Sequence, residues 1–483
     1  MGLIDDILSN LPEVAPPTQK RLSFKEKLKW TSAILVLFYV LGLVPLFGLG
    51  VNALAQFEAL SIILGAQFGS IISLGIGPIV TASIVLQLLN GSGIVKFDLN
   101  THEGKKRFQG IQKVLAVFFI LFEAAIYVFM GGLAPAEIFR GTPAYFIFEI
   151  ILVIQLFVGG ILILFMDEVI SKWGFGSGVS LFIAANVSQG IFVRALSPLP
   201  SPSNPEMMTG AIPGLFQALA NNDVTGALTL FFAVFFTIVV FVVAVYGQAM
   251  KVEIPLSFGR VRGHGIRWPL SFMYTSNIPV ILIAALMANF QLWARLLERA
   301  GYPLLGTFSG NTPISGFVTW LYPPNIVRKI IDGNLNILNF NYAPDLGFLG
   351  SVWQTFSNSD VLHGLVYMLI LMLGSMVFSI FWVQTSGMDA KSQAKNIMSS
   401  GLQIPGFRRD PRILERVLER YIGPLTVMGG LAIGFLAALA DLSGALGNGT
   451  GILLAVMIIY RLYEEIAKQH MMDMHPMMRK FME

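Results

Sequence analysis

The sequence predicts an all-α membrane protein with ten transmembrane helices, arranged as two oppositely oriented five-helix halves with a pathway between them. Of its 483 residues, 55% are hydrophobic and only 12% are charged, whereas soluble domains carry about 25% charged residues. Apolar runs long enough to cross a bilayer recur along the chain. A glycine motif occurs twice, at the same place in each half. These observations exclude a water-soluble fold.

The first 29 residues hold an amphipathic stretch, LIDDILSNL, then Pro16-Pro17 and a basic SFKEKLKW segment. We expect a cytoplasmic surface helix, a bend and an approach to the membrane. No removable signal peptide is evident, so the first spanning helix is expected to serve as the targeting signal. The expected spans are residues 30–49, 71–89, 111–130, 145–166, 179–196, 227–246, 273–292, 361–383, 421–440 and 450–467.

The distribution of positive charge predicts the orientation, because cytoplasmic loops retain Lys and Arg. Most of the 32 Lys and Arg residues fall in alternate connections that share a side with both termini. We therefore expect a multi-pass protein of the cell membrane with both termini in the cytoplasm. The expected units are 1–29 (N-terminal segment), 30–196 (first half), 197–226 (outer connection), 227–467 (second half, with outer loop 297–360) and 468–483 (tail).

Internal repetition supports the two halves. Gly159-Gly160 in the fourth span matches Gly429-Gly430 in the ninth, and the pattern Gly-x-Gly-[Ser/Thr]-Gly precedes the fifth and tenth spans at 174–178 and 447–451. Five spans in each half invert the second copy relative to the first. We expect a pseudo-two-fold axis with the pathway between the halves.

The second and seventh spans are interrupted near their starts. Gly75, Gly77 and Pro78 lie in the run from Ser70 to Leu89, and Pro279 takes the same early place in the seventh span. Lipid-facing backbone cannot be left without hydrogen bonds, so such breaks belong beside a cavity. Paired interruptions in two halves indicate a central pathway.

The stretch 53–69 is too short and too polar to span a membrane and directly precedes the interrupted second span. One interpretation is a re-entrant half-helix that returns into the cavity. The other is an amphipathic helix that lies on the outer leaflet. Spacing alone does not choose between them.

Two cytoplasmic loops, 251–268 and 384–420, are more than simple connectors. The first alternates around a glycine-rich basic tip with Arg260, Arg262 and Arg267, which predicts a projecting hairpin. The second carries Arg408 and Arg409 ahead of an amphipathic helix. Both loops are candidate docking surfaces for an anionic partner, although the positive-inside rule alone explains most of this charge.

Several long strings resemble the SecY family, the pore-forming subunit of the protein-translocation channel, in its archaeal and eukaryotic branch. They include LGIGPIVTASIVLQLL, DEVISKWGFGSGVSLFIAANVSQGIF, VEIPLSFGR, SNIPVIL, IFWVQTSGMDAKS, RYIGPLTVMGG and GALGNGTGILL. The resemblance covers nearly all ten spans and both cytoplasmic loops, but not the outer segments 197–226 and 297–360.

The resemblance implies an hourglass channel that conducts unfolded secretory polypeptides, binds their signal sequences and releases apolar segments laterally into membrane lipid. It implies SecE/gamma-type and beta-type small membrane subunits, and a ribosome or another cytosolic driving partner on the two loops. The residues it assigns are an aliphatic pore ring (Ile76, Val80, Val179, Ile183, Ile281, Leu454), a plug at about 54–69 (Leu54, Phe57, Leu60, Ile63, Leu64, Phe68), a lateral gate (Thr81, Glu123, Asn289) and docking arginines (Arg260, Arg262, Arg267, Arg408, Arg409).

The residues leave blander interpretations open. Most aliphatic side chains in spans are core or face lipid, and the three gate residues would also serve as ordinary interhelical hydrogen-bond partners. Aliphatic residues that cluster beside the Gly and Pro breaks favour the ring. A ring without donors or charges would hold no particular substrate and would impede water and ions by dewetting.

A secondary transporter with inverted repeats is the alternative function. It would need an ionisable binding cluster at mid-membrane, whereas the spans offer little beyond Glu123, Gln155 and Asn289. An intramembrane hydrolase around Ser177 lacks a nearby base. Without cysteine, and with only scattered His and Met in the tail, we expect no catalytic residues, no metal site and no cofactor.

Overall fold

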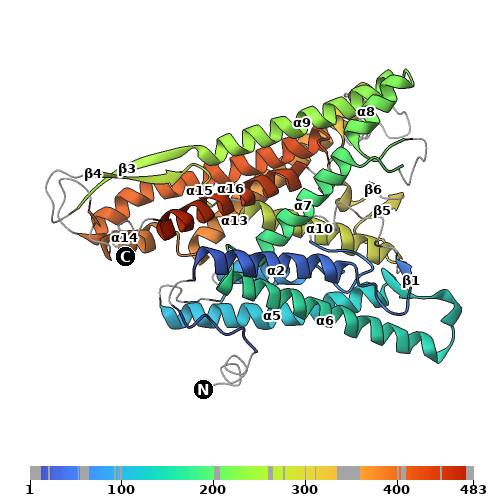
Figure 1. The fold of residues 1–483 in the computed structure, drawn as a ribbon, viewed down its shortest axis with the longest axis horizontal. Helices are drawn as coiled ribbons and strands as arrows, with labels where there is room; N and C mark the ends of the chain where they lie inside the picture. Colours follow the sequence, from blue (N-terminus) through green and yellow to red (C-terminus); the bar gives the residue numbers. More distant parts are fainter. Residues whose placement is uncertain are drawn as a thin grey trace, which may run out of the picture.

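The structure of the chain is a computed structural model. It describes residues 12–19, 22–52, 54, 65–91, 94–95, 97, 101–200, 207–258, 265–275, 278–299, 301–309, 312–333, 359–399, 402–403, 410–446 and 449–474. Helices α9, α13, α15 and α16 lie along one side, α2, α5 and α6 along the other, and α7 and α10 cross between them (Figure 1).

Each of the ten predicted spans corresponds to a helix among the described residues. The first half holds α2 (Phe24–Gly42), α4 (Gly77–Gly91), α5 (His102–Phe129), α6 (Pro143–Trp173) and α7 (Gly178–Leu196). The second half holds α9 (Val224–Ala249), α10 (Ile278–Arg299), α13 (Asp360–Thr385), α15 (Pro411–Leu442) and α16 (Gly449–Met474). Seven of them, α5, α6, α7, α9, α10, α13 and α15, are long and apolar enough to cross a membrane by themselves. The ten-helix, two-half fold is confirmed.

Two predicted span boundaries are wrong. Helix α2 ends at Gly42 rather than near residue 49, and the chain turns into strand β1 (Leu49–Asn52), which pairs with β2 (Leu133–Pro135). The apolar residues after Gly42 continue the hydropathy signal without continuing the helix. The second span is helical only from Gly77, because the residues before it form tight turns.

These turns put irregular backbone inside the protein. Residues 72–76 are buried, and successive three-residue hydrogen bonds join Ser73 N to Ser70 O, Gly75 N to Ile72 O and Gly77 N to Leu74 O. Gly75 has a φ of 56°, a conformation that side chains with a Cβ rarely adopt. Hydrogen bonds within the protein thus pair backbone groups that would have no partner in lipid. Pro78 and Pro279 each occupy the second position of a helix, where a missing N–H costs nothing.

The paired glycines make equivalent contacts in the two halves. A Cβ added to Gly159 would lie 1.8 Å from Ile71 O, in the backbone just before α4, and one added to Gly429 would lie 2.8 Å from Phe272 O, just before α10. The second glycine of each pair packs on the next helix: Gly160 meets Ile120 of α5, and Gly430 meets Ser379 of α13. The sequence repeat is therefore a repeat of packing.

One end of the bundle carries the two antiparallel strands of the predicted hairpin, whereas its basic tip, residues 259–264, lies outside the described residues. Strand β3 (Lys251–Phe258) pairs antiparallel with β4 (Gly265–Ser271) and with β7 (Leu402–Gln403), beside helix α14 (Ala390–Ser399). We call this end the hairpin end. Strands β3 and β4 lie at this end, and β3 continues directly from the end of α9 (Figure 1).

The opposite end, the far end, carries short elements between the long helices (Figure 1). They are α8 (Ala211–Ala220), β5 (Thr307–Ser309), β6 (Thr312–Ser315), the 3₁₀ helices Glu137–Phe139 and Phe317–Leu321, and α11 (Ile326–Ile331).

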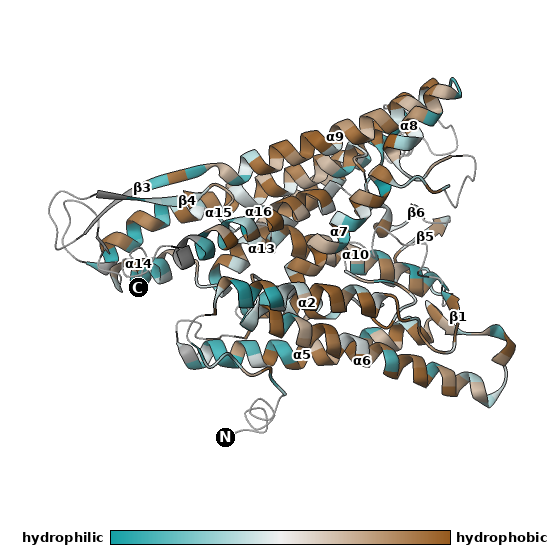
Figure 2. Ribbon diagram, viewed as in Figure 1, coloured by the Kyte–Doolittle hydropathy of each residue, from teal (hydrophilic) through white to brown (hydrophobic). Residues whose placement is uncertain are grey.

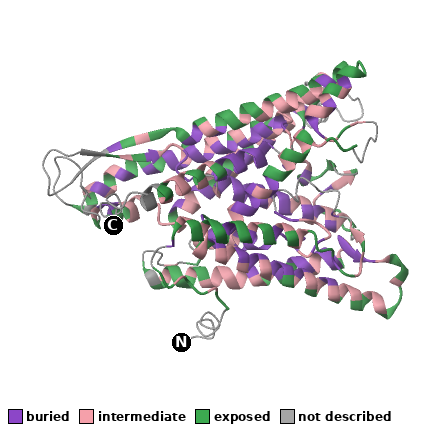
Figure 3. Cartoon of the chain, in the orientation of Figure 1, coloured by how far each residue is buried: buried purple, intermediate pink, exposed green. Residues whose placement is uncertain are grey.

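Burial is concentrated where the halves meet, around α7, α10 and α16 (Figure 3). The outer helices are apolar as well, and α9 is brown along most of its length (Figure 2). Only 6% of its most apolar window is buried. An apolar surface of this size is what a lipid-facing helix presents.

Candidate functional site

A cavity of about 750 Å³ lies between the two halves at the hairpin end. Its walls come from α4, α5, the α6–α7 turn, α10, α13 and α16, and they mix polar and charged groups such as Lys105, Gln109 and Arg461 with apolar ones. Val80, Val179 and Ile281 also line it. The cavity is thus polar near the helix ends and aliphatic toward the middle of the bundle.

The six predicted ring residues lie in or against one buried hydrophobic cluster. Ile76 and Val80 come from the start of α4 and the turn before it, Ile281 from α10, Val179 and Ile183 from α7 and Leu454 from α16. Their exposed fractions are at most 6%, except for Val179, which is partly buried. Helices α4, α10, α16 and α7 contact one another in that sequence. The fold thus brings together residues from both halves that are up to 378 positions apart in the sequence.

The three predicted gate residues form one hydrogen-bonded chain across three helices. Asn289 Nδ2 on α10 donates to Thr81 Oγ1 on α4 at 3.0 Å, and Thr81 Oγ1 lies 3.2 Å from Glu123 Oε1 on α5. All three side chains are at most 6% exposed. The Thr81–Asn289 bond directly joins the first half to the second.

The predicted plug segment is described only at its ends. Leu54 is 1% exposed and packs with Leu292 and Leu296 of α10. A Cβ added to Gly65 would lie 3.7 Å from Ile76 and from Phe182, and Phe68 packs against the same apolar cluster as Leu54. Both ends are inside the bundle, which favours the re-entrant interpretation over a helix lying on the leaflet. Phe57, Leu60, Ile63 and Leu64 lie outside the described residues.

Of the five predicted docking arginines, Arg267 alone lies within the described residues. It sits on β4, where its Nη1 is 2.9 Å from Glu253 Oε2 of β3, and both side chains are more than half exposed. Arg260, Arg262, Arg408 and Arg409 lie outside the described residues. The amphipathic helix predicted after Arg409 is the first part of α15.

Two partly buried carboxylates that sequence reasoning missed secure the starts of the fifth and tenth spans. Asp167 of α6 accepts from the backbone N–H groups of Gly178 and Val179, the first two residues of α7. Asp441 of α15 accepts from those of Gly449 and Thr450, the first two residues of α16. Asp167 precedes the first glycine of its motif by seven positions and Asp441 precedes its own by six.

The glycines of the motif allow this approach. A Cβ at Gly178 would lie 2.6 Å from Asp167 Cα, and one at Gly449 would lie 2.0 Å from the backbone of Ala440. The helix starts therefore rest on the preceding helix backbone. Asp441 also accepts from the Tyr367 hydroxyl of α13 at 2.6 Å.

Comparison with known proteins identifies the family. The SecY family model matches residues 70–463. The chain belongs to the SecY family. The protein translocase subunit SecY of Methanothermobacter thermautotrophicus is 43% identical over 482 residues, covering 99% of this chain and 98% of that protein.

Solved structures agree with a SecY fold. One described as the structure of a protein conducting channel matches with a TM-score of 0.80 and 39% identity over 99% of both chains. Sec61 in the canine ribosome-channel complex from the endoplasmic reticulum matches with a TM-score of 0.76 and 38% identity, again over 99% of both chains. This SecY-family chain is a multi-pass membrane protein.

In this SecY fold, residues that a transporter or a hydrolase would have used make structural hydrogen bonds instead. Gln155 hydrogen-bonds the backbone N–H and C=O of Phe47 and so serves the α2–β1 turn. Ser177 hydrogen-bonds Asp167 at the start of α7, and the His363 ring contacts Thr319 O. Among the described residues, no group of three or more His, Asp or Glu side chains is placed to hold a metal ion.

Proposed function

We propose that this chain is the channel subunit of a protein translocase, which conducts unfolded polypeptides across the membrane and releases apolar segments sideways into lipid. The observation that carries the proposal is the cavity between the halves, polar at its mouth and lined by Val80, Val179 and Ile281 toward the middle. A binding transporter would place its specific contacts where these side chains lie.

The aliphatic residues suit a passage for chains of any sequence. Ile76, Val80, Val179, Ile183, Ile281 and Leu454 would act together as a collar. Branched aliphatic side chains present neither a hydrogen-bond donor nor a charge, so they would hold no substrate segment. Closely packed, they would also exclude water and small ions by dewetting.

Lateral release would use the seam between α4 and α10. A hydrogen bond between transmembrane helices contributes on average only about 0.6 kcal/mol, so the Thr81–Asn289 bond at 3.0 Å would not prevent opening. An apolar segment of a passing chain could then partition into lipid. Residues 54–69 would seal the far side of the collar when no substrate is present, since Gly65 lies against Ile76.

The hairpin end would face the cytoplasm and bind the driving partner. Sec61 in a ribosome-channel complex is similar over its whole length, which supports a ribosome as that partner. Ribosomal RNA offers phosphates to arginines. Arg267 is exposed on β4, Arg260 and Arg262 are close to it in sequence, and Arg408 and Arg409 precede α15 in the second loop. SecE/gamma-type and beta-type subunits would cover exposed apolar helices. The chain itself would have no enzymatic activity.

Photocrosslinking tests this function. A photoreactive residue at position 80 should crosslink to a nascent polypeptide stalled during translocation, and the same residue at position 238 of α9 should not. Ile238 is 58% exposed on the outer face of the bundle, so it controls for non-specific labelling. Equal labelling at both positions, or none at 80, would contradict a central passage.

A further inference from the structure

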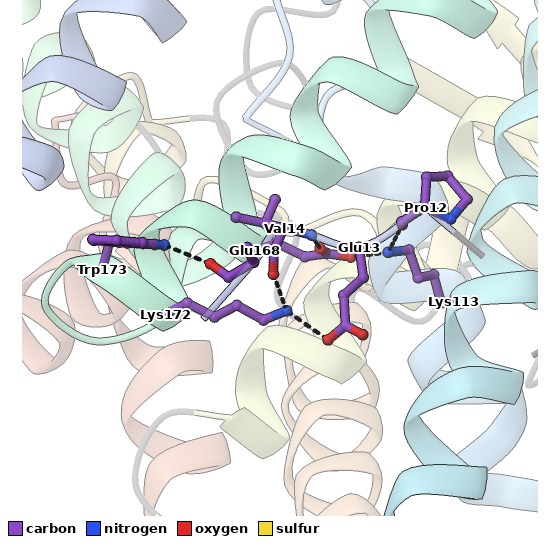
Figure 4. Close-up of polar contacts among 8 residues, drawn as sticks. Pro12, Glu13, Val14, Lys113, Glu168, Lys172 and Trp173 are labelled. Atoms are coloured by element: carbon purple, nitrogen blue, oxygen red, sulfur yellow. Dashed lines mark hydrogen bonds and ion pairs between the residues drawn. The ribbon is translucent and has the colours of Figure 1, made fainter. Parts of the chain in front are cut away.

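A short extended segment ahead of α2, residues 12–15, lies across the hairpin-end parts of α5 and α6 (Figure 4). We call it the strap. Its sequence is Pro-Glu-Val-Ala, followed by Pro16-Pro17. Proline keeps the chain extended and removes a donor at each proline position.

The strap is held mainly through its backbone. Val14 N–H donates to Glu168 Oε2 at 2.9 Å, and Val14 O accepts from Lys172 Nζ at 2.6 Å. Ala15 O accepts from Trp173 Nε1 at 2.9 Å. Pro12 O accepts from Lys113 Nζ of α5 at 2.5 Å. Four side chains from two helices thus bind one donor and three acceptors of an extended peptide (Figure 4).

The side chains that bind the strap are themselves paired and largely covered. Lys113 pairs with Glu168, which links α5 to α6, and these side chains are only 13% and 16% exposed. Lys172 is 22% exposed. Charged side chains rarely become so covered unless they are paired and hydrogen-bonded. Their hydrogen bonds to peptide groups are charge-assisted and therefore stronger than neutral ones.

One strap side chain adds a polar contact of its own, since Glu13 pairs with Lys172 at 2.5 Å. That carboxylate is 66% exposed, and exposed ion pairs contribute little. The Ala15 side chain is exposed and Val14 is only partly buried. Recognition therefore depends on the extended backbone rather than on side-chain identity.

We propose that Lys113, Glu168, Lys172 and Trp173 form a peptide-backbone binding site on α5 and α6, whose occupant is the chain's own residues 12–15. The site lies at the rim of the cavity, because the preceding residues Gln112 and Asp167 line the cavity itself. Docking therefore fixes the N-terminal segment beside the cavity mouth and ties α2, α5 and α6 together there.

A spin label at position 15 tests the site. The chain has no cysteine, so Ala15→Cys provides a unique attachment point, and the carbonyl that binds Trp173 is retained. In the full-length protein the label should be motionally restricted. Combining Lys172→Met with Trp173→Phe should convert most of the signal to a mobile one. Lys105→Met makes the same charge change on α5, outside the site, and should leave the label restricted.

Backbone recognition has a separate test. Replacing Glu13 and Val14 together by alanine should keep the label restricted. Release as complete as in the Lys172→Met/Trp173→Phe variant would show that the side chains are read and would overturn the proposal. A mobile label in the otherwise unsubstituted chain would overturn it too.

Amide exchange checks docking without altering the site. The Val14 N–H should exchange at least tenfold more slowly in the protein than in a free peptide of residues 10–18, because it donates to Glu168. Equal rates would reject the docked strap even if the site variants fail to fold.

Discussion

Asp167 and Asp441 occupy equivalent places in the two halves, and each carboxylate accepts hydrogen bonds from the first two backbone N–H groups of the helix that follows. Carboxylates are favoured there by the unpaired N–H groups and the helix dipole. The two helices so held, α7 and α16, carry three of the six ring residues: Val179, Ile183 and Leu454. The repeated glycine motif and these acids together set where those side chains stand.

Replacing Asp441 by alanine should destabilise the protein by about 2–4 kcal/mol, because it removes a cap worth about 1 kcal/mol and leaves the buried Tyr367 hydroxyl without its acceptor, at about 1–3 kcal/mol. Thermal unfolding of the purified protein measures this loss. Asp223→Ala removes an exposed cap at the start of α9 and is the matched control, with a smaller expected effect. Equal losses would refute a special role for Asp441.

Widening the proposed collar should make the resting channel leak. Changing Ile76, Val80 and Ile281 to glycine removes branched side chains from the meeting point of the halves, and ion conductance in a planar bilayer should rise severalfold. Ile238→Gly is the control on the outer face of α9, where no rise is expected. Unchanged conductance in the triple variant would argue against the collar.

The gate seam should show weak coupling. A double-mutant cycle with Thr81→Val and Asn289→Leu should give a coupling free energy of about 0.6 kcal/mol. In either single variant the seam should open more easily, so the hydrophobicity threshold for insertion into lipid should fall. Substrates whose test segments contain graded numbers of leucines measure this threshold. Gln155→Leu also removes a span amide but contacts Phe47, so it should not shift that threshold.

Loss of one docking arginine should weaken ribosome binding in a salt-dependent way. For Arg267→Ala, we expect the slope of log affinity against log salt to decrease by about 0.9 if one phosphate contact is lost. Its exposed pair with Glu253 contributes at most about 1 kcal/mol to the fold, so folding should be retained. Arg140 is exposed at the far end, so the Arg140→Ala variant should bind the ribosome normally. An unchanged slope for Arg267→Ala would remove this residue from the interface.

Acid should loosen the strap slightly. The hydrogen bond and charge of Lys172, with Lys113 and Lys106 nearby, lower the pKa of Glu13 from its ordinary value of 4.5. A lowered pKa means that the contact stabilises docking above that ordinary value and is lost as pH falls through the lowered one. The mobile fraction of the position-15 label should rise modestly below about pH 4, and Glu13→Gln should abolish the part due to this residue.

Hydropathy and repetition predicted what depends on long patterns: ten spans, two halves and the basic hairpin. They did not predict features that depend on a few neighbouring residues, such as the end of α2, the strap and the two aspartates. Residues 43–49 remain apolar after α2 ends, so composition could not locate the turn at Gly42. The strap has no periodicity, and its partners Lys113 and Lys172 read only as topology signals. Asp167 and Asp441 lie near span ends, where an acid attracts no notice until the helix starts that they bind are known.

The cavity has a consequence for cargo. Ile76 and Val80, and likewise Val179 and Ile183, are four positions apart on helical backbone, so the proposed collar would be only about one helical turn, roughly 5–6 Å, deep. A threaded segment would then shed its hydration over very few residues at once. Charged stretches, whose full transfer into hydrocarbon is costly, would pay that penalty only briefly, which would let a greasy constriction pass hydrophilic proteins.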